Sequence, residues 1–361
     1  MEYYILPKHS YIPPISPQFS FLDSNNRLPV FISPTLQYYT DRLYRQISTF
    51  EDIYTKTYIS QLYTTFSPVL CNNNQNNIFC YEIMEIFSSD ILHYLNSPNG
   101  SITKTTVLGI CENPDISKIA LKLSFPDTNL IIVNSSESFQ NIIDYYITRT
   151  QISLINSVDR FIFDIPNGSN INTSQYIHWL LLYLLMVMKY QMNGGNCAIK
   201  IYGIHFKPIV EIIYIFTKLY TNTIIVRPSI TPQCSKYCYL VCTNYCGQVA
   251  DALYTNISTT LCNHLNHSPP NSCISSLFSN ENHMPIYFLS KLDEINIILS
   301  RAYFSIFEQI IAFMSNSNNI NKHKSLENIQ KIHLEKYYTW RQCHNICNIY
   351  DNSMALVTTD K

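Results

Sequence analysis

Short apolar and β-branched runs alternate with longer segments of helical periodicity through the middle of the chain. The short runs predict buried strands, and the longer segments predict helices with an apolar face. Such alternation is typical of an α/β domain with a mainly parallel sheet. The predicted strands cover 105–108, 130–133, 160–163, 197–202, 223–226 and 239–242, and the predicted helices cover 116–123, 138–146, 174–191 and 208–220.

The last two predicted strands are joined by too little chain for a crossover helix. Because parallel neighbours need such a crossover, we expect these two strands to pair antiparallel. The predicted fold class is therefore α/β, with a core over 100–246.

The segments on either side of this core have different patterns. Prolines are dense over residues 1–40, which excludes long helices there and predicts an extended arm lying on a surface. An N-terminal unit of arm and helices (1–99) and a mostly helical C-terminal extension (247–361) complete the predicted organisation. In these flanks, helices are predicted over 37–66, 78–95, 289–314 and 325–338, and a polar loop over 263–282.

Composition places the chain among globular proteins, with 46 % hydrophobic and 14 % charged residues. The chain has 24 Lys and Arg residues and 25 Asp and Glu residues, which gives a net charge of −1. This charge excludes binding through a large overall positive field but not through a local basic groove. The strongest apolar run, 176–188, is shorter than the roughly 20 residues of a membrane span and predicts a buried helix.

Signal-peptide features are absent from the first residues, so we expect an intracellular protein with reduced cysteines. Four of its 12 cysteines, Cys234, Cys238, Cys242 and Cys246, recur at a spacing of four. On a strand they would share one face over too great a length to bind one ion. Structural cysteines are therefore expected and no metal, with a metal site as the less favoured alternative.

Ligands of open α/β sheets bind beyond the carboxyl ends of the strands. Five of the 7 glycines lie in or beside the predicted strand–helix block, which suggests backbone positions with positive φ or close approach. These five are Gly109, Gly168, Gly194, Gly195 and Gly203.

The first predicted strand ends in the sequence Val-Leu-Gly-Ile-Cys-Glu-Asn-Pro-Asp, residues 107–115. It lacks the G-x-G-x-x-G pattern and the G-K-[ST] phosphate loop, which disfavours a nicotinamide dinucleotide site. It resembles the hydrophobic-x-Cys-Glu-x-Pro-Gly-Gly turn that opens the cofactor site of FtsJ-like (RrmJ-type) ribose 2′-O-methyltransferases, including those of large DNA viruses.

Three further segments are similar to this family, in the family's order. Residues 194–200 resemble its Gly-Gly-x-x-x-x-Lys strand, and Asp164 stands where its strand-four aspartate belongs. Residues 226–229 and 235–242 resemble its Lys/Arg-Pro-x-x-Ser and Ser-Glu-x-Tyr-hydrophobic-hydrophobic-Cys ending. The resemblance covers the middle two-fifths of the chain and implies a Rossmann-like S-adenosylmethionine-dependent methyltransferase sheet.

The resemblance also implies an activity, methyl transfer from S-adenosylmethionine to an RNA ribose 2′-hydroxyl, with an mRNA cap as one such RNA. That hydroxyl is a poor nucleophile and must be aligned while its proton is removed. The family carries a Lys-Asp-Lys-Glu tetrad, in which Asp164 and Lys200 match the second and third members and Lys200 acts on the hydroxyl. The implied cofactor-binding residues are Gly109, Cys111, Glu112, Pro114, Asn134 and Asp164.

This chain departs from the family at several of these positions. The window for the first tetrad lysine, 78–103, holds no lysine or arginine, and the closing glutamate would fall on Lys236 or Tyr237. Asp115-Ile116 replaces the Gly-Gly of the cofactor turn, where side chains oppose a close backbone approach. Asn134 stands where the family usually presents an acid to the adenosine ribose, and an amide binds a hydroxyl less strongly than a carboxylate.

Two hypotheses follow from these matches and departures. The first is an active RNA 2′-O-methyltransferase with RNA as its partner. The second is a catalytically inactive accessory subunit or RNA- or protein-binding scaffold, with a protein partner subunit; neither involves a membrane. At single positions, Asp164 could instead cap a turn, Lys200 could be an edge lysine reaching solvent, Glu112 could start a helix, and Arg227 could contact phosphate or form a solvated ion pair.

Overall fold

The computed structural model describes a central sheet, its helices and part of each flank. The described residues are 1–8, 15–22, 28–48, 78–88, 106–111, 121, 128–134, 139–148, 151, 154–164, 173–231, 235–247, 250–267, 273–278, 284–315, 335, 339–340 and 342–343.

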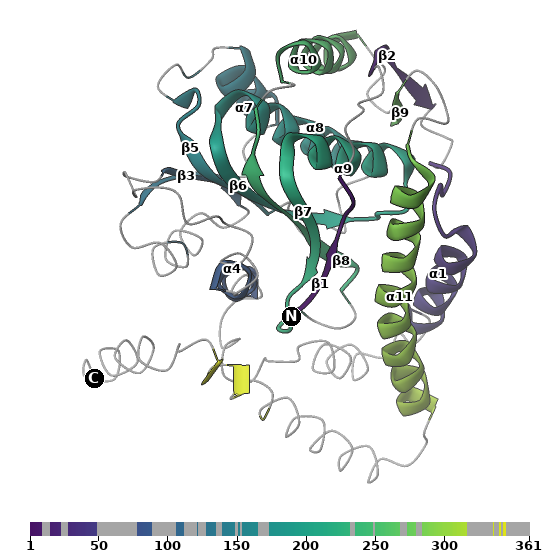
Figure 1. The fold of residues 1–361 in the computed structure, drawn as a ribbon. Coiled ribbons are helices and arrows are strands. Elements are labelled where there is room, and N and C mark those ends of the chain that lie inside the picture. The colour runs from purple at the N-terminus through teal and green to yellow at the C-terminus, as the bar shows by residue number, and fades with distance from the viewer. Residues whose placement is uncertain are drawn as a thin grey trace, which may run out of the picture.

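In the described part of the chain, seven strands form the central sheet, in the order β1-β7-β8-β6-β5-β3-β4 (Figure 1). Strands β4, β3, β5 and β6 run parallel, while β8 is antiparallel to both of its neighbours, β6 and β7. This confirms the α/β fold class with a mainly parallel sheet and the antiparallel pairing of the last two predicted strands. The strands are β1 (Glu2–Ile5), β3 (Thr106–Cys111), β4 (Asn129–Asn134), β5 (Val158–Phe163), β6 (Gln191–Tyr202), β7 (Tyr220–Arg227) and β8 (Tyr237–Tyr245).

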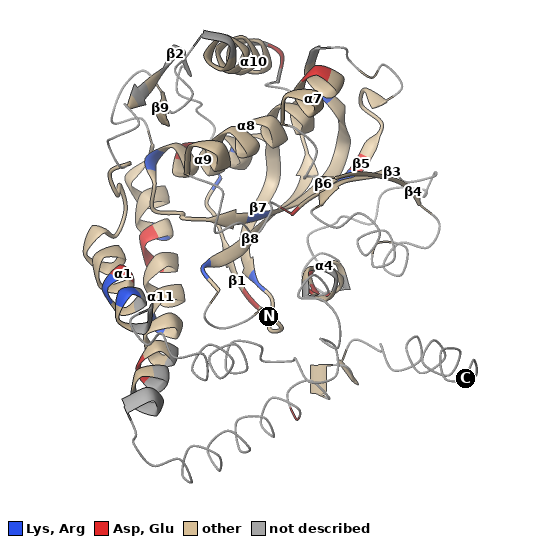
Figure 2. Ribbon diagram, turned by 180° about the vertical axis from the view of Figure 1, so that it is seen from behind, with Lys and Arg blue, Asp and Glu red and all other residues tan. Residues whose placement is uncertain are grey.

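Helices cover both faces of the sheet (Figure 1). On one face lie α7 (Phe139–Ile143), the π-helical turn Asp144–Thr148, α8 (Thr173–Tyr190) and α9 (Lys207–Leu219), which share a core with that face. On the other face, α4 (Ile78–Ser88) packs its apolar side chains against the strands. Figure 2 shows that the strands and these helices are mostly uncharged.

The apolar run 176–188 forms the middle of α8, whose side chains are buried nearly all around. A helix that is apolar on every side belongs in a protein core or a membrane. Here it is sandwiched between the sheet and α10 (Ala250–His267), as predicted for a buried helix. Within the described residues, the structure contains no helix long and apolar enough to span a membrane.

The described residues of the polar stretch 263–282 are not a loop, which corrects the sequence prediction for them. Its first residues end α10, and Cys273–Phe278 form β9, which pairs antiparallel with β2 (Ile15–Leu22). The burial of Ser276 in β9 is possible because Glu211 of α9 accepts hydrogen bonds from Ser276 Oγ and the Leu277 amide, at 2.7 and 2.6 Å.

The N-terminal segment contributes to both sheets through β1 and β2, so part of the predicted arm is paired strand. Helix α1 (Pro34–Ser48) begins at a proline, which suits a first helical position. It packs beside the long α11 (Ile286–Ser315), which corresponds to the helix predicted over 289–314. The predicted helices 116–123 and 325–338 lie almost wholly outside the described residues.

Three of the five singled-out glycines have the predicted backbone roles. Gly194 and Gly203 have φ of +81° and +61°, and a Cβ on Gly195 would lie 2.7 Å from the Asp159 carbonyl oxygen. Gly168 is outside the described residues. A Cβ on Gly109 would make contacts no closer than 3.5 Å, so that position has room for a methyl group.

Cys238 and Cys242 are buried on one face of β8 as free thiols, and Cys234 is outside the described residues. The described part of the chain contains no group of three or more His, Cys, Asp or Glu residues that could bind a metal ion.

Candidate functional site

Asp164 and Lys200 meet where two parallel strands end. Asp164 follows the last residue of β5, and Lys200 follows Ile199, which is paired with that last residue. Lys200 Nζ lies 3.2 Å from Asp164 Oδ1, and the two residues are 3 % and 8 % exposed. The two residues carried over from the family tetrad therefore form a buried ion pair.

Tyr237 lies against the Lys200 ammonium. Its ring centroid is 4.1 Å from Lys200 Nζ, within the range of a cation–π interaction. Tyr237 begins β8, which pairs with the end of β6 opposite Tyr202. It is one of the two positions at which the closing tetrad glutamate was sought. The other, Lys236, is partly exposed and pairs with Asp41 of α1 at 3.5 Å.

A carboxylate does approach Lys200, but it comes from α4. Glu82 is fully buried and accepts hydrogen bonds from Thr231 Oγ1 at 2.6 Å, Tyr237 Oη at 2.8 Å and Tyr239 Oη at 2.6 Å. Burial raises the pKa of Glu82 above its ordinary value, although the Lys200 charge and the three hydroxyl donors oppose this. Tyr237 thus connects Glu82 with the Lys200–Asp164 pair.

The surrounding groups hold Lys200 in its charged form. Burial alone would lower its pKa, but Asp164, followed by Tyr237, Tyr202 and Glu82, outweighs burial and raises the pKa well above its ordinary value. An ammonium with so high a pKa does not accept a proton near neutral pH. In this geometry the ion pair with Asp164 favours the ammonium form of Lys200, which is not the form that a general base requires.

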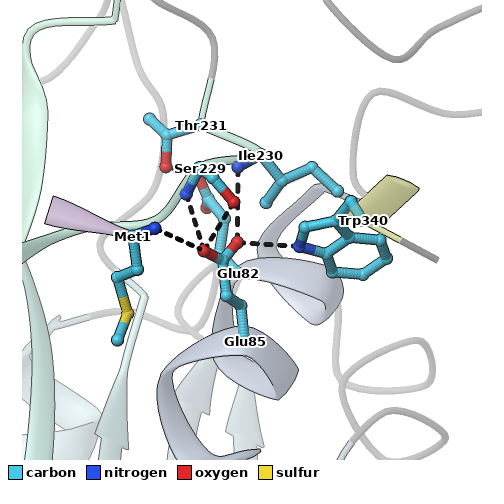
Figure 3. A network of polar contacts seen from close by, with 7 residues as sticks. All are labelled: Met1, Glu82, Glu85, Ser229, Ile230, Thr231 and Trp340. Atoms are coloured by element: carbon cyan, nitrogen blue, oxygen red, sulfur yellow. Dashed lines mark hydrogen bonds and ion pairs between the residues drawn. The ribbon is translucent and has the colours of Figure 1, made fainter. Parts of the chain in front are cut away.

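Glu85, one turn along α4, ties the helix to other parts of the chain (Figure 3). It accepts hydrogen bonds from Ser229 N and Oγ at 2.8 and 2.7 Å, from Ile230 N at 3.3 Å and from Trp340 Nε1 at 2.9 Å. The Met1 ammonium lies 3.7 Å from the same carboxylate. These contacts fix α4 over the segment that follows β7 and hold Glu82 in place.

Of the residues predicted for cofactor binding, some lie at the carboxyl ends of strands and one lies inside a strand. Cys111 and Asn134 are paired partners at the carboxyl ends of β3 and β4, on the same sheet edge as Asp164. Cys111 is fully buried and Asn134 is half-buried. Gly109 lies inside β3, paired with Ile132 and Ile162. Glu112 and Pro114 lie outside the described residues, so the cofactor assignment stays a prediction.

The described residues do not fit S-adenosylmethionine well. A ribose is best held by a carboxylate, but β4 ends in an amide, Asn134. Asp164 is paired with Lys200, and Glu82 accepts three hydroxyl hydrogen bonds, so both described carboxylates near these strand ends already have partners. Gly109 has room for a methyl group, so β3 shows no close backbone cradle there.

Glu82 and its hydroxyl donors were missed at the sequence level. A signal was present, because Glu82 and Glu85 interrupt the apolar face of the sequence Ile-Phe-Cys-Tyr-Glu-Ile-Met-Glu-Ile-Phe-Ser in α4. Carboxylates on an apolar helix face require buried partners. Arg227 is buried, with its guanidinium 5.1 Å from the Tyr303 ring centroid, so it is not a solvated residue, and a contact with phosphate stays a prediction.

Among solved structures, 63 chains are similar to this one, and two of them are given below; no family model and no curated protein matches. A protein described as a ribosomal RNA methyltransferase from Plasmodium falciparum superimposes with a TM-score of 0.32 and 16 % identity, over 47 % of this chain and 97 % of that one. A TehB-like SAM-dependent methyltransferase from Corynebacterium glutamicum gives a TM-score of 0.25 and 11 % identity, over 58 % of this chain and 98 % of that one.

Proposed function

We propose that this protein is a methyltransferase-fold accessory subunit that does not transfer methyl groups itself. The observation that carries the proposal is the buried set of Lys200, Asp164, Tyr237 and Glu82. The lysine that the family resemblance makes catalytic is 3 % exposed and paired, and an aromatic ring covers its ammonium. A ribose hydroxyl has to reach within hydrogen-bond distance of such a group for proton transfer.

The electrostatics of the set support the same conclusion. Catalytic lysines that accept protons have a lowered pKa, whereas Asp164 and its neighbours raise the pKa of Lys200. The set has the features of a structural ion pair that closes the strand ends. An accessory subunit keeps a fold of this kind for its surfaces rather than for its reaction.

Binding of S-adenosylmethionine tests the proposal directly. We expect isothermal calorimetry with the full chain to give no binding heat and thermal melting to give no cofactor-dependent shift. A methyl-transfer assay on capped and uncapped RNA should give no product above the protein-free blank. Cofactor binding together with 2′-O-methylated product that disappears in Lys200→Ala would overturn the proposal.

The second candidate is an active RNA ribose 2′-O-methyltransferase. The observation in its favour is that Asp164 and Lys200 lie side by side at adjacent strand ends, 3.2 Å apart, as the family resemblance implies. The activity would require the set around Lys200 to open when cofactor and RNA bind. Asp164→Asn separates the two candidates, because it should abolish activity in an enzyme and change only stability in an accessory subunit.

The proposed partner is a protein rather than RNA. The net charge of −1 provides no overall attraction for a phosphate backbone. For a protein partner, we expect a fluorescence titration with single-stranded RNA at low and moderate salt to show no salt-dependent binding. Tight binding that weakens steeply with salt would point to an RNA-binding scaffold instead.

A further inference from the structure

A continuous exposed stripe runs along α11 (Ile286–Ser315), the long helix at the side of the molecule (Figure 1). Its members recur at spacings of three and four, which places them on one helix face. The buried face of α11 lies against the core of the protein. The exposed stripe comprises Ile286, Tyr287, Ser290, Glu294, Ile297, Ile298, Arg301, Ser305 and Glu308.

The middle of the stripe is apolar where a solvent-facing helix usually carries polar residues. Ile297 is 51 % exposed and Ile298 is 37 % exposed. Charged residues flank the two isoleucines, Glu294 on one side and Arg301 on the other. Exposed isoleucines bordered by charges are typical of a surface that another helix covers.

The stripe is chemically symmetric about the point between Ile297 and Ile298. Glu294 precedes Ile297 by three residues, and Arg301 follows Ile298 by three. Ser290 and Ser305 lie further out, at equal distances from this midpoint. In an antiparallel pair of such helices, Ser290 of one copy would face Ser305 of the other. A helix with this order is complementary to an antiparallel copy of itself.

We propose that two copies of this chain form a homodimer by antiparallel packing of α11 against α11. A two-fold axis through the midpoint of the stripe makes the interface isologous, so every contact occurs twice. Ile297 then packs on Ile298 of the partner subunit, and Glu294 pairs with Arg301 of the partner subunit. The serines further out let the two helix backbones approach closely.

The charges needed for these pairs are available. Glu294 is bonded at 2.8 Å to Lys291 of its own helix, yet its side chain remains 54 % exposed. Arg301 is exposed and has no ion pair with any residue that the structure describes. From Tyr287 to Glu308 the stripe is about 33 Å long at 1.5 Å per residue, enough for several turns of helix contact.

Charge reversal on this stripe tests the dimer and its geometry together. Multi-angle light scattering of the full chain over a concentration series should give a mass approaching twice 42.0 kDa. Glu294→Arg and Arg301→Glu should each weaken dimerisation at least about tenfold, because each creates two like-charge contacts. The two variants mixed in equal amounts should form a heterodimer, since both of its charge pairs are again opposite.

Arg42→Glu is the matched control, because it makes the same change at an exposed arginine of α1. It should leave dimerisation unchanged, and circular dichroism should show that all variants keep the wild-type helix content. A wild-type mass of 42.0 kDa at every concentration would refute the proposal. So would single reversals that leave the dimer intact, or a mixture of the two that stays monomeric, since both outcomes exclude the antiparallel pairing.

Discussion

Lys200 and Asp164 form a buried pair whose energetics differ from those of a surface ion pair. Both residues are buried, and Lys200 Nζ lies 3.2 Å from Asp164 Oδ1. Removing one partner leaves the other charge buried without its ion-pair partner, which costs far more than the pair itself contributes. The pair therefore makes the two residues energetically interdependent.

Lys200→Met should lower the free energy of unfolding by about 3–5 kcal/mol. The double variant Lys200→Met with Asp164→Asn should lose clearly less than the sum of the two single variants, because it removes both charges. Urea unfolding of the four proteins in this double-mutant cycle gives the coupling energy. If the losses of unfolding free energy in the two single variants add up to the loss in the double variant, the two side chains do not interact as the structure places them.

At the scale of elements, β9 is attached to α9 through Glu211. Burial raises the pKa of Glu211 to about 7, although hydrogen bonds from Leu277 N and Ser276 Oγ and the Lys207 charge oppose the shift. Because the pKa is raised in the folded state, the stabilisation is fully present below the ordinary value of 4.5 and is lost as pH rises through about 7.

The stability contributed by Glu211 should fall by about 3 kcal/mol between pH 4.5 and 7.5, as a shift of this size implies. Glu211→Gln does not titrate, so the difference in unfolding free energy between wild type and this variant isolates the Glu211 contribution at each pH. Urea melts of both proteins across this range measure it. A difference that stays constant with pH would contradict the assignment.

The strands of the sheet could be located from the sequence because buried parallel strands are continuous apolar runs. Strands β1 and β9 could not be located this way. The partners of both lie more than 200 residues away in the chain, and β9 carries a buried serine, Ser276, whose hydroxyl donates to Glu211. Pairing of this kind is decided by tertiary contacts and leaves no local periodicity.

The candidate site, like the strands, could be predicted only in part from the sequence. Asp164 follows the end of β5 and Lys200 lies near the end of β6, both of which the pattern locates, and parallel pairing then brings them together. Glu82 arrives from a helix more than 80 residues upstream of Asp164, and only the packed structure shows that α4 lies over the strand ends. The sequence indicated a buried carboxylate on α4 but not its partners.

At the scale of the whole molecule, segments far apart in the chain close the site together. Glu85 of α4 contacts Ser229 and Ile230 after β7 and Trp340 near the C-terminus (Figure 3). With α4 fixed in this way, Glu82 and Tyr237 stay over Lys200. Access to Lys200 therefore depends on the contacts of Glu85, not on contacts of Lys200 itself.

Chemical labelling of lysine amines tests this dependence. In the wild-type protein, Lys200 should resist an amine-acylating reagent that modifies the exposed Lys236, as read by peptide mass spectrometry. Glu85→Ala leaves the Ser229, Ile230 and Trp340 donors without their acceptor, which should cost about 1–3 kcal/mol per buried donor and increase Lys200 labelling severalfold. Glu85→Gln keeps one acceptor oxygen, so its Lys200 labelling should lie between that of the wild-type protein and that of Glu85→Ala. Lys236 serves as the internal control, and its labelling should be the same in all three proteins. Equal Lys200 labelling in all three proteins would mean that α4 does not control access to Lys200.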